Sequence, residues 1–322
     1  EHVAVAKKVG LPKPVGLTAE DHAGAHEVLK RHMSFVNSAQ MLEKSTAAAA
    51  ALASTIPAKL SPPPQTEVLI VGAGLTGLSV AAAFRDEAKV AKLHLIEKAQ
   101  LVSGVWSFYG NCFSRVNISG PSYYLPTKDR TRTSILHPFH FDILEDTLAV
   151  IRLNKLEKRI SLLSEVKAIG SVDEATGLRG VTGLVEKTTR FRSDARLVCM
   201  CTNRRLGSPR QIKFTGEDDF RGLIRRGLGD DTKDMATEWA DKRAVIVGMG
   251  AYAIEVMRTA LERDDGCEHI TLLARQLTTV VPRVLDWLGI IRPWNSDYRT
   301  RSYKASRLSG KLIFDLYAIS GA

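Results

Sequence analysis

Two glycine-rich segments in this 322-residue chain have the spacing of phosphate-binding turns. In the first, Gly72, Gly74 and Gly77 follow an apolar run at 68–71 and precede an alanine-rich segment. In such a motif the first glycine permits a tight turn, the second lets the backbone approach a pyrophosphate, and the third lets a helix pack closely on a strand. The helix N-terminus then offers free N–H groups to the phosphates. The segment therefore predicts a strand, a dinucleotide-binding turn and a helix.

A carboxylate stands where a dinucleotide-binding unit needs one. Glu97 follows the predicted strand 92–96, and its distance from Gly72 is close to the roughly 20 residues after which the ribose-binding acid follows. Its oxygens would accept hydrogen bonds from the 2′- and 3′-hydroxyls of an adenosine ribose. Because the strand, the glycines, the helix and the acid occur in the required order, we expect Glu97 to bind a cofactor.

A second motif begins at Gly248 and Gly250, with Ala253 at its third position, where alanine is an allowed variant. The next predicted strand, at 269–274, is followed by Arg275 and not by an acid. A guanidinium suits the 2′-phosphate of NADPH, whereas an acid would suit NADH. We therefore expect this motif to bind NADPH, and an incidental arginine at a strand end is the alternative.

These motifs and their flanking segments predict an α/β fold with two Rossmann-like dinucleotide-binding domains and an N-terminal helical extension. We place the extension and a proline-rich linker at 1–64. The first dinucleotide-binding domain is expected at 65–210, and the second, with a basic C-terminal tail, at 211–322.

A smaller pattern interrupts the first domain. Apolar residues recur at helical spacing from 143 to 156. Strand-like segments at 161–169 and 180–186 then flank a turn at 173–177, which predicts a small antiparallel excursion. The segment 190–201 is expected to return to the main sheet.

The N-terminal extension predicts a helix from about Thr18 to Met41. An alanine run at 47–51 and three prolines at 62–64 are interpreted as a linker. We expect the extension to wrap a domain or to dock on a protein partner. The chain begins at Glu1 without an initiator methionine, as a processed form or a portion of a longer protein would. Its composition also suits the remainder of a targeting region for a chloroplast or mitochondrion; otherwise the cytoplasm is expected.

The charge balance is basic, with a formal net charge of +10 and a pI of about 9.5. Such a balance suits an anionic cofactor such as NADPH, an acidic partner protein, nucleic acid, or simply a solvated basic surface. The basic tail at 287–322 is interpreted as a solvated face or a patch that docks an acidic protein. Because it contains no recognised nucleic-acid-binding module, we do not expect nucleic acid. No apolar window approaches the roughly 18 residues of a membrane span, so no transmembrane segment is expected.

Cysteines and histidines give no prediction of a disulfide framework or a metal site. Four cysteines are too few for such a framework in a chain of this length, and Cys199 and Cys201 are expected to be small buried residues of a strand. The close histidine pairs lack carboxylate or cysteine partners at matching spacing. These pairs are His22 with His26 and His137 with His140.

Over about residues 66–290, which include both glycine motifs, the chain resembles flavin-containing monooxygenases and Baeyer–Villiger monooxygenases. The run S-G-V-W-S-F at 103–108 is similar to the family's G-G-x-W segment, with Ser103 in place of a glycine. Residues 109–124 resemble the loop that runs over the flavin ring. The resemblance implies that Trp106 and Asn117 flank that ring. It also assigns Gly72, Gly74, Gly77 and Glu97 to FAD, and Gly248, Gly250 and Arg275 to NADPH.

Two positions depart from the family pattern. Cys201-Thr202-Asn203 stands where the family has A-T-G, and asparagine tolerates the left-handed backbone of such a turn better than most residues. Arg226 stands at the histidine of the family's F-x-G-x-x-x-H signature. Arginine keeps a donor and a fixed charge there but does not titrate. Relatives also continue further and return a last strand and helix to the FAD domain.

The resemblance implies a flavin-dependent NADPH oxidoreductase that oxygenates a small nucleophilic or carbonyl substrate. A reductase that passes electrons from NADPH to another acceptor would use the same cofactor sites. The altered positions and the additions at both ends also fit a non-catalytic accessory subunit of a larger, organellar assembly, and these alternatives stay open.

Overall fold

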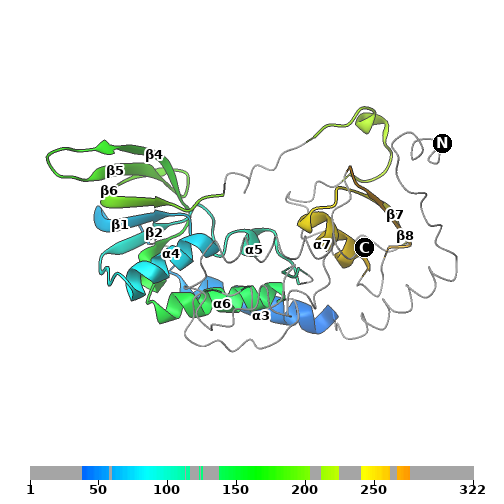
Figure 1. Ribbon diagram of the computed structural model, residues 1–322, viewed down its shortest axis with the longest axis horizontal. Coiled ribbons are helices and arrows are strands. Elements are labelled where there is room, and N and C mark those ends of the chain that lie inside the picture. Colours follow the sequence, from blue (N-terminus) through cyan, green and yellow to red (C-terminus); the bar gives the residue numbers. More distant parts are fainter. Residues whose placement is uncertain are drawn as a thin grey trace, which may run out of the picture.

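The chain forms two separate β-sheets with helices packed against them (Figure 1). The computed structural model describes residues 38–57, 60–112, 114–116, 123, 125, 138–203, 212–224, 241–261 and 267–275. Most of the predicted helix at 18–41 and the basic tail at 287–322 lie outside these residues. No helix in the described part is both long and apolar enough to cross a membrane.

The larger sheet has six strands in the order β3-β2-β1-β6-β5-β4. Strands β3, β2, β1 and β6 run parallel, whereas β4, β5 and β6 form an antiparallel meander. Strand β1 is central, and its second half, residues 68–71, is apolar and buried, as expected of a parallel strand inside a sheet. The strands are β1 Gln65–Val71, β2 Leu93–Ile96, β3 Ile160–Ser161, β4 Ser164–Val172, β5 Arg179–Val185 and β6 Thr189–Met200.

The predicted antiparallel excursion and the return to the main sheet are both confirmed. Strands β4 and β5 pair antiparallel, and β6 pairs parallel with β1, with Val71 opposite Met200. The turn between β4 and β5 closes because the Gly177 N–H donates to the Asp173 carbonyl at 2.8 Å. The Asp173 carboxylate also accepts hydrogen bonds from the Ala175 and Thr176 N–H groups.

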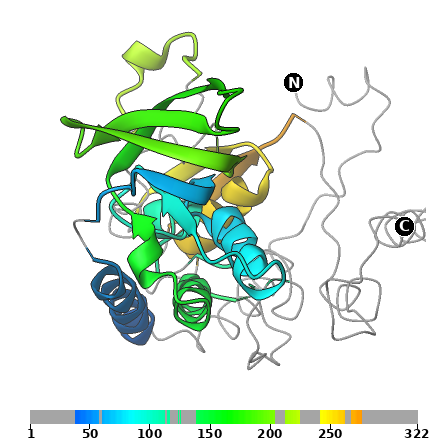
Figure 2. The same cartoon turned by 90° about the vertical axis from the view of Figure 1, so that its left-hand side faces the viewer.

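Three helices cover one face of the large sheet: α3 Ser38–Thr55, α4 Leu75–Asp86 and α6 His140–Leu153. Figure 2 shows them on the same side of the strands, and α6 packs against both α3 and α4. The main hydrophobic core lies between these helices and the sheet. The helix predicted at 143–156 corresponds to α6, which ends earlier, at Leu153, and is followed by the short 3₁₀-helix η2, Glu157–Arg159.

The alanine run at 47–51 is not a linker, contrary to the sequence-based interpretation. It lies inside α3, where Ala48 and the fully buried Leu52 belong to the main core. A run of alanines favours helix strongly, and small side chains let α3 approach α6 closely. This part of the extension therefore packs on the first domain. Of the two expectations for the extension, this agrees with the one that it wraps a domain.

The smaller sheet holds the second dinucleotide-binding motif. Strands β7 Arg243–Val247 and β8 His269–Leu273 pair parallel, with Val247 opposite Leu273, and α7 Ala251–Leu261 connects them. A strand, a glycine turn, a helix and a parallel strand follow in the predicted order. The short 3₁₀-helix η3, Glu217–Asp219, precedes this unit.

The docking of α3 gives a stability prediction. Leu52→Ala should lower the free energy of unfolding by about 2 to 5 kcal/mol, because it leaves a cavity in the main core. Leu42, which is 59% exposed on the same helix, supplies the control, and Leu42→Ala should change the free energy of unfolding by less than about 0.5 kcal/mol. Urea denaturation measures both, and equal effects would contradict the packing of α3.

Candidate functional site

The first glycine motif joins β1 to α4 through a turn that only glycine can form. Gly72 has φ +102°, and a Cβ there would lie 2.7 Å from the carbonyl oxygen of Cys201. A Cβ on Gly77 would collide with the carbonyl oxygen of Gly72. Two of the three predicted glycines are thus required by backbone contact alone. The roles predicted for the tight turn and for close packing fit this geometry.

The second glycine leaves the N-terminus of α4 open. Gly74 is the N-cap residue, and no side chain caps the helix there. The Cα of Gly104 lies 3.6 Å from where a Cβ of Gly74 would be, so two stretches of backbone meet over the turn. An uncapped helix start with no side chain over it is the arrangement that receives a phosphate group.

Glu97 lies directly at this turn. One carboxylate oxygen accepts a hydrogen bond from the Ala73 N–H at 2.7 Å, and the other accepts one from the Ala99 N–H at 2.9 Å. The side chain is buried. A carboxylate has about four lone-pair positions, so acceptor capacity remains after these two bonds. The structure therefore brings the predicted acid and the predicted glycines together at the carboxyl ends of β1 and β2.

Ser103 replaces the family glycine in a conformation that explains why glycine is usual there. Its φ is +78°, and the following Gly104 has φ +58°. The Ser103 N–H donates to the Ala73 carbonyl at 3.0 Å, and its hydroxyl lies 3.0 Å from that of Thr147. Thr147 donates its only proton to the Ile143 carbonyl, so Ser103 donates to Thr147. This buried bond holds the strained serine, and no local sequence pattern indicated Thr147 as its partner.

Trp106 lies on the short helix α5 Val105–Phe108, beside the glycine turn. Its indole N–H donates to the Tyr123 hydroxyl at 3.0 Å, and the two rings meet edge to face. Burial raises the pKa of Tyr123, while the hydrogen bond with Trp106 opposes that shift. Asn117 and Arg226, the other residues expected near the reacting ring, lie outside the described residues, and their roles stay predictions.

His140, one of the histidines considered for metal binding, is held by contacts with other parts of the protein. The first residue of α6, it is buried, and its Nδ1 lies 2.7 Å from the hydroxyl of Ser45 on α3. Its ring also abuts Gly110, where a Cβ would collide with it. The N-terminal helix is thus joined through one side chain to the loop that follows Trp106. Its expected neighbour His137 is outside the described residues.

The end of β6 differs from what the sequence predicted. Cys199 and Cys201 are half-buried instead of buried, although both pack against the main core, and partial burial raises the pKa of each thiol. The Cys201 N–H donates to the Val71 carbonyl at 2.8 Å. Asn203 is exposed and is not among the residues with positive φ. The left-handed turn considered for this segment is therefore absent at Asn203.

The second glycine motif resembles the first but leaves more room around its second and third positions. Gly248 has φ +121°, and its N–H donates to the Leu273 carbonyl at 2.8 Å. A Cβ on Gly248 would lie 3.9 Å from that of Ala253, so alanine fits at the third position, while the space at Gly250 is open. Arg275 is exposed just beyond β8. Because β7 and β8 are parallel, Gly248, Gly250 and Arg275 lie at the same edge of the small sheet.

Tyr252, on the first turn of α7, interacts electrostatically with two tyrosines near the first motif. Burial raises the pKa of Tyr252, and the nearby Glu255, Tyr109 and Tyr123 raise it further. Tyr109 follows α5, and Tyr123 is the partner of Trp106. The second motif therefore starts beside the loop that extends from the first one.

Comparison with known proteins agrees with this geometry. A family model described as an NAD(P)-binding Rossmann-like domain matches residues 70–136. The FAD-binding monooxygenase ktnD of Aspergillus niger is 26% identical over 238 residues, which make up 72% of this chain and 38% of that protein. A probable FAD-binding monooxygenase, AlmA, of an Acinetobacter species is 22% identical over 218 residues, 67% of this chain and 42% of that one. The chain thus spans about two fifths of the length of these curated relatives.

Solved structures with the same fold include monooxygenases and a bacillithiol disulfide reductase from Bacillus cereus. An open structure of cyclohexanone monooxygenase superposes with a TM-score of 0.54 at 18% identity, covering 68% of this chain and 41% of that one. An oxidised steroid monooxygenase bound to NADP gives a TM-score of 0.50 at 20% identity, covering 65% of this chain and 38% of the other. The predicted α/β fold with two Rossmann-like dinucleotide-binding units is confirmed at the level of the fold.

Ser103 permits a test of the strain at the glycine turn. Ser103→Ala keeps the positive φ and removes the hydrogen bond to Thr147, so it should lower the free energy of unfolding by about 1 to 2 kcal/mol. Ser103→Gly removes the same bond but relieves the backbone, and should be more stable than the alanine variant by about 1 kcal/mol. Chemical denaturation of both variants measures the difference. An alanine variant as stable as the glycine variant would contradict the strained backbone.

Proposed function

The chain is a divergent relative of FAD-binding monooxygenases, and on that premise we propose that it is a flavin-dependent NADPH oxidoreductase. FAD would bind at the first glycine motif and NADPH at the second. The observation that carries this proposal is the position of Glu97, whose carboxylate is held to the Ala73 N–H at the mouth of an uncapped helix. A purely structural turn would not need a carboxylate with spare acceptor capacity there.

The residues of the first motif fit FAD. The diphosphate would lie over Gly74, where no Cβ or capping side chain intervenes, and would accept hydrogen bonds from the first turn of α4. The ribose hydroxyls would donate to the remaining lone pairs of Glu97. The Ser103–Gly104 backbone and Trp106 form the neighbouring wall. Bound FAD would supply hydride acceptance from a nicotinamide and electron transfer to oxygen or another acceptor.

The residues of the second motif fit NADPH. Its diphosphate would approach Gly248 and Gly250, where the backbone is accessible. The exposed Arg275 at the same edge would bind the 2′-phosphate in a charge-assisted contact. Tyr252, Tyr109 and Tyr123 lie near one another between the two motifs.

We propose further that the reaction is oxygenation of a small nucleophilic or carbonyl substrate. The names of the curated relatives support a monooxygenase. A reductase for another acceptor would need the same two sites. The exposed Asn203, without a left-handed turn, and Arg226 in place of a histidine favour a second candidate, a non-catalytic accessory subunit.

The absorbance spectrum of the purified protein tests these proposals. An oxidised flavin absorbs at about 450 nm, and this band should bleach when NADPH is added without oxygen. A protein that binds no FAD even after reconstitution would refute both enzyme proposals and favour the accessory subunit. If the band bleaches, analysis of products formed with oxygen separates an oxygenase from a reductase.

Glu97→Gln should weaken FAD binding by about tenfold or more. Both carboxylate oxygens accept a hydrogen bond from a backbone N–H. Glutamine replaces one of these oxygens with an NH₂ group, which is itself a donor and cannot accept the backbone N–H that faces it. Glu67→Gln changes an exposed carboxylate of β1 and is the matched control. Fluorescence titration of the apoprotein with FAD measures both. Unchanged affinity in Glu97→Gln would refute the assigned role.

Arg275→Ala should weaken NADPH binding by about ten- to a hundredfold and leave NADH nearly unaffected, because only NADPH carries the 2′-phosphate. Arg243→Ala provides the control, since Arg243 is exposed at the start of β7, whereas the glycine turn follows the end of that strand. Rates of flavin reduction at varied NADPH and NADH report both affinities. Equal losses for the two nucleotides would refute a phosphate contact.

A further inference from the structure

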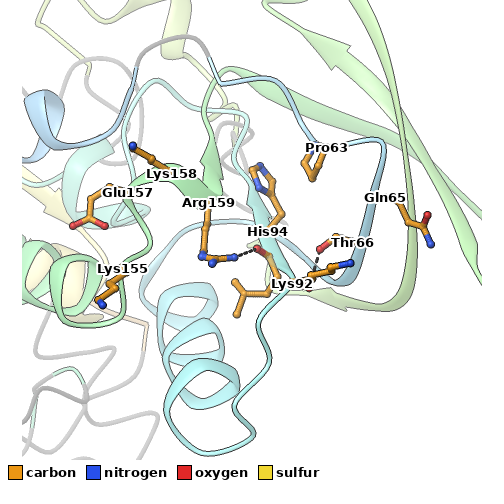
Figure 3. Close-up of a pocket in the computed structure, with 10 residues that line it drawn as sticks. Pro63, Gln65, Thr66, Lys92, His94, Lys155, Glu157, Lys158 and Arg159 are labelled. Atoms are coloured by element: carbon orange, nitrogen blue, oxygen red, sulfur yellow. Dashed lines mark hydrogen bonds between the residues drawn. The ribbon is translucent and has the colours of Figure 1, made fainter.

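We propose that an open cavity at the edge of the large sheet opposite the glycine turn binds a small anion with two or three phosphate groups. The cavity has a volume of about 700 Å³ (Figure 3), within the range of small-molecule sites. Strand starts line one side, and the segment from the end of α6 through η2 lines the other. The lining residues are Pro63, Gln65, Thr66, Lys92, Leu93, His94, Lys155, Glu157, Lys158 and Arg159.

The cavity is separate from the proposed cofactor sites. It lies where β1 and β2 begin, at Gln65 and Leu93, whereas the glycine turn follows their last residues, Val71 and Ile96. Each strand residue advances about 3.3 Å, so the seven residues of β1 put the two sites roughly 20 Å apart. A ligand in the cavity would therefore not occupy the dinucleotide site.

The charge of the cavity is strongly positive and locally uncompensated. Four basic side chains line it and only one acidic side chain, Glu157. Within the described residues, no carboxylate pairs with Lys92, Lys155 or Lys158. Exposed lysines elsewhere do find partners: Lys167 lies 2.8 Å from Glu165, and Lys213 lies 2.8 Å from Asp218.

Arg85, which does not line the cavity, adds a further positive charge close to Arg159. Arg159 donates to the Ala91 carbonyl at 2.7 Å, and Arg85 donates to the Val90 carbonyl at 2.9 Å, so both hold the turn before β2. The Nε of Arg85 is buried without a hydrogen-bond partner. Burial lowers the pKa of Arg159, and the charge of Arg85 lowers it further. A bound anion would relieve the repulsion between these two cations.

The floor of the cavity is polar but already satisfied. The His94 Nε2 lies 2.8 Å from the Ser161 hydroxyl, and Thr66 donates to the Lys92 carbonyl at 2.9 Å. Burial, with a contribution from Arg159, lowers the pKa of His94 to about 4, so this histidine is neutral at pH 7. Recognition of the anion therefore falls to the lysines and Arg159.

The arrangement of the cations favours a compact anion over an acidic polypeptide. Figure 3 shows Lys92 and Thr66 on the strand side, Lys155, Glu157 and Lys158 on the opposite side, and Arg159 with His94 between them. Cations on two sides of a hollow suit several charges on one small ligand. An extended acidic segment would instead need a row of cations along an open surface. Lysine and arginine are also the side chains that bind phosphate groups most often.

Calorimetric titration with inorganic pyrophosphate tests the proposal, with and without excess FAD and NADP⁺. The double variant Lys92→Ala/Lys158→Ala removes two exposed lining lysines and should weaken pyrophosphate binding by about tenfold or more. The double variant Lys167→Ala/Lys213→Ala removes the same charge outside the cavity and should weaken binding less than about twofold. Unchanged melting temperatures verify that both variants are folded.

Four outcomes would overturn the proposal. Pyrophosphate that does not bind below about 5 mM, which corresponds to roughly 3 kcal/mol of binding free energy, would show that the cavity is not an anion site. Competition by FAD would place the pyrophosphate at the glycine turn. Equal losses in the two double variants would indicate only general attraction to a basic protein. Tighter binding of poly-glutamate that displaces pyrophosphate would identify an acidic polypeptide as the occupant. Because the lysine variants do not touch the glycine motifs, failure here leaves the proposed oxidoreductase untested and intact.

Discussion

The first glycine turn depends on the close contact of three pieces of backbone. Gly72 lies against the carbonyl of Cys201 at the end of β6, and Gly77 lies against the carbonyl of Gly72 itself. Neither position has room for a Cβ, so β1, β6 and the start of α4 are fixed relative to one another. This contact fixes the positions of the uncapped helix N-terminus and of the Ala73 N–H to which the Glu97 carboxylate binds. The cofactor binding proposed at this edge would thus be a property of the sheet and not of a separate loop.

Side chains from distant elements support that turn from the outside. Ser103 connects the turn to Thr147 on α6, and His140 at the start of α6 connects to Ser45 on α3. The same histidine abuts Gly110, beyond the helix that bears Trp106. An N-terminal helix, a crossing helix and an aromatic loop therefore share one polar framework. Their relative positions set the wall of the proposed flavin site.

Local spacing was enough to predict both glycine motifs, Glu97 and the antiparallel excursion, because each depends on residues close in sequence. Features that depend on distant partners were missed or misjudged. The alanine run of α3 is core only because α6 covers it, and Thr147 meets Ser103 from 44 residues away. The basic cavity joins residues from 63 to 159, which no motif brings together.

The position of β1 has a consequence for the order of folding during synthesis. This strand, whose second half is apolar, pairs with β2, made shortly afterwards, but also with β6, which is made more than 100 residues later. Until β6 emerges from the ribosome, one edge of β1 has no partner, and such an edge invites pairing with other chains. Pairings over long sequence separations also form slowly. The strand that positions the cofactor turn is therefore the strand on which the nascent chain most needs protection.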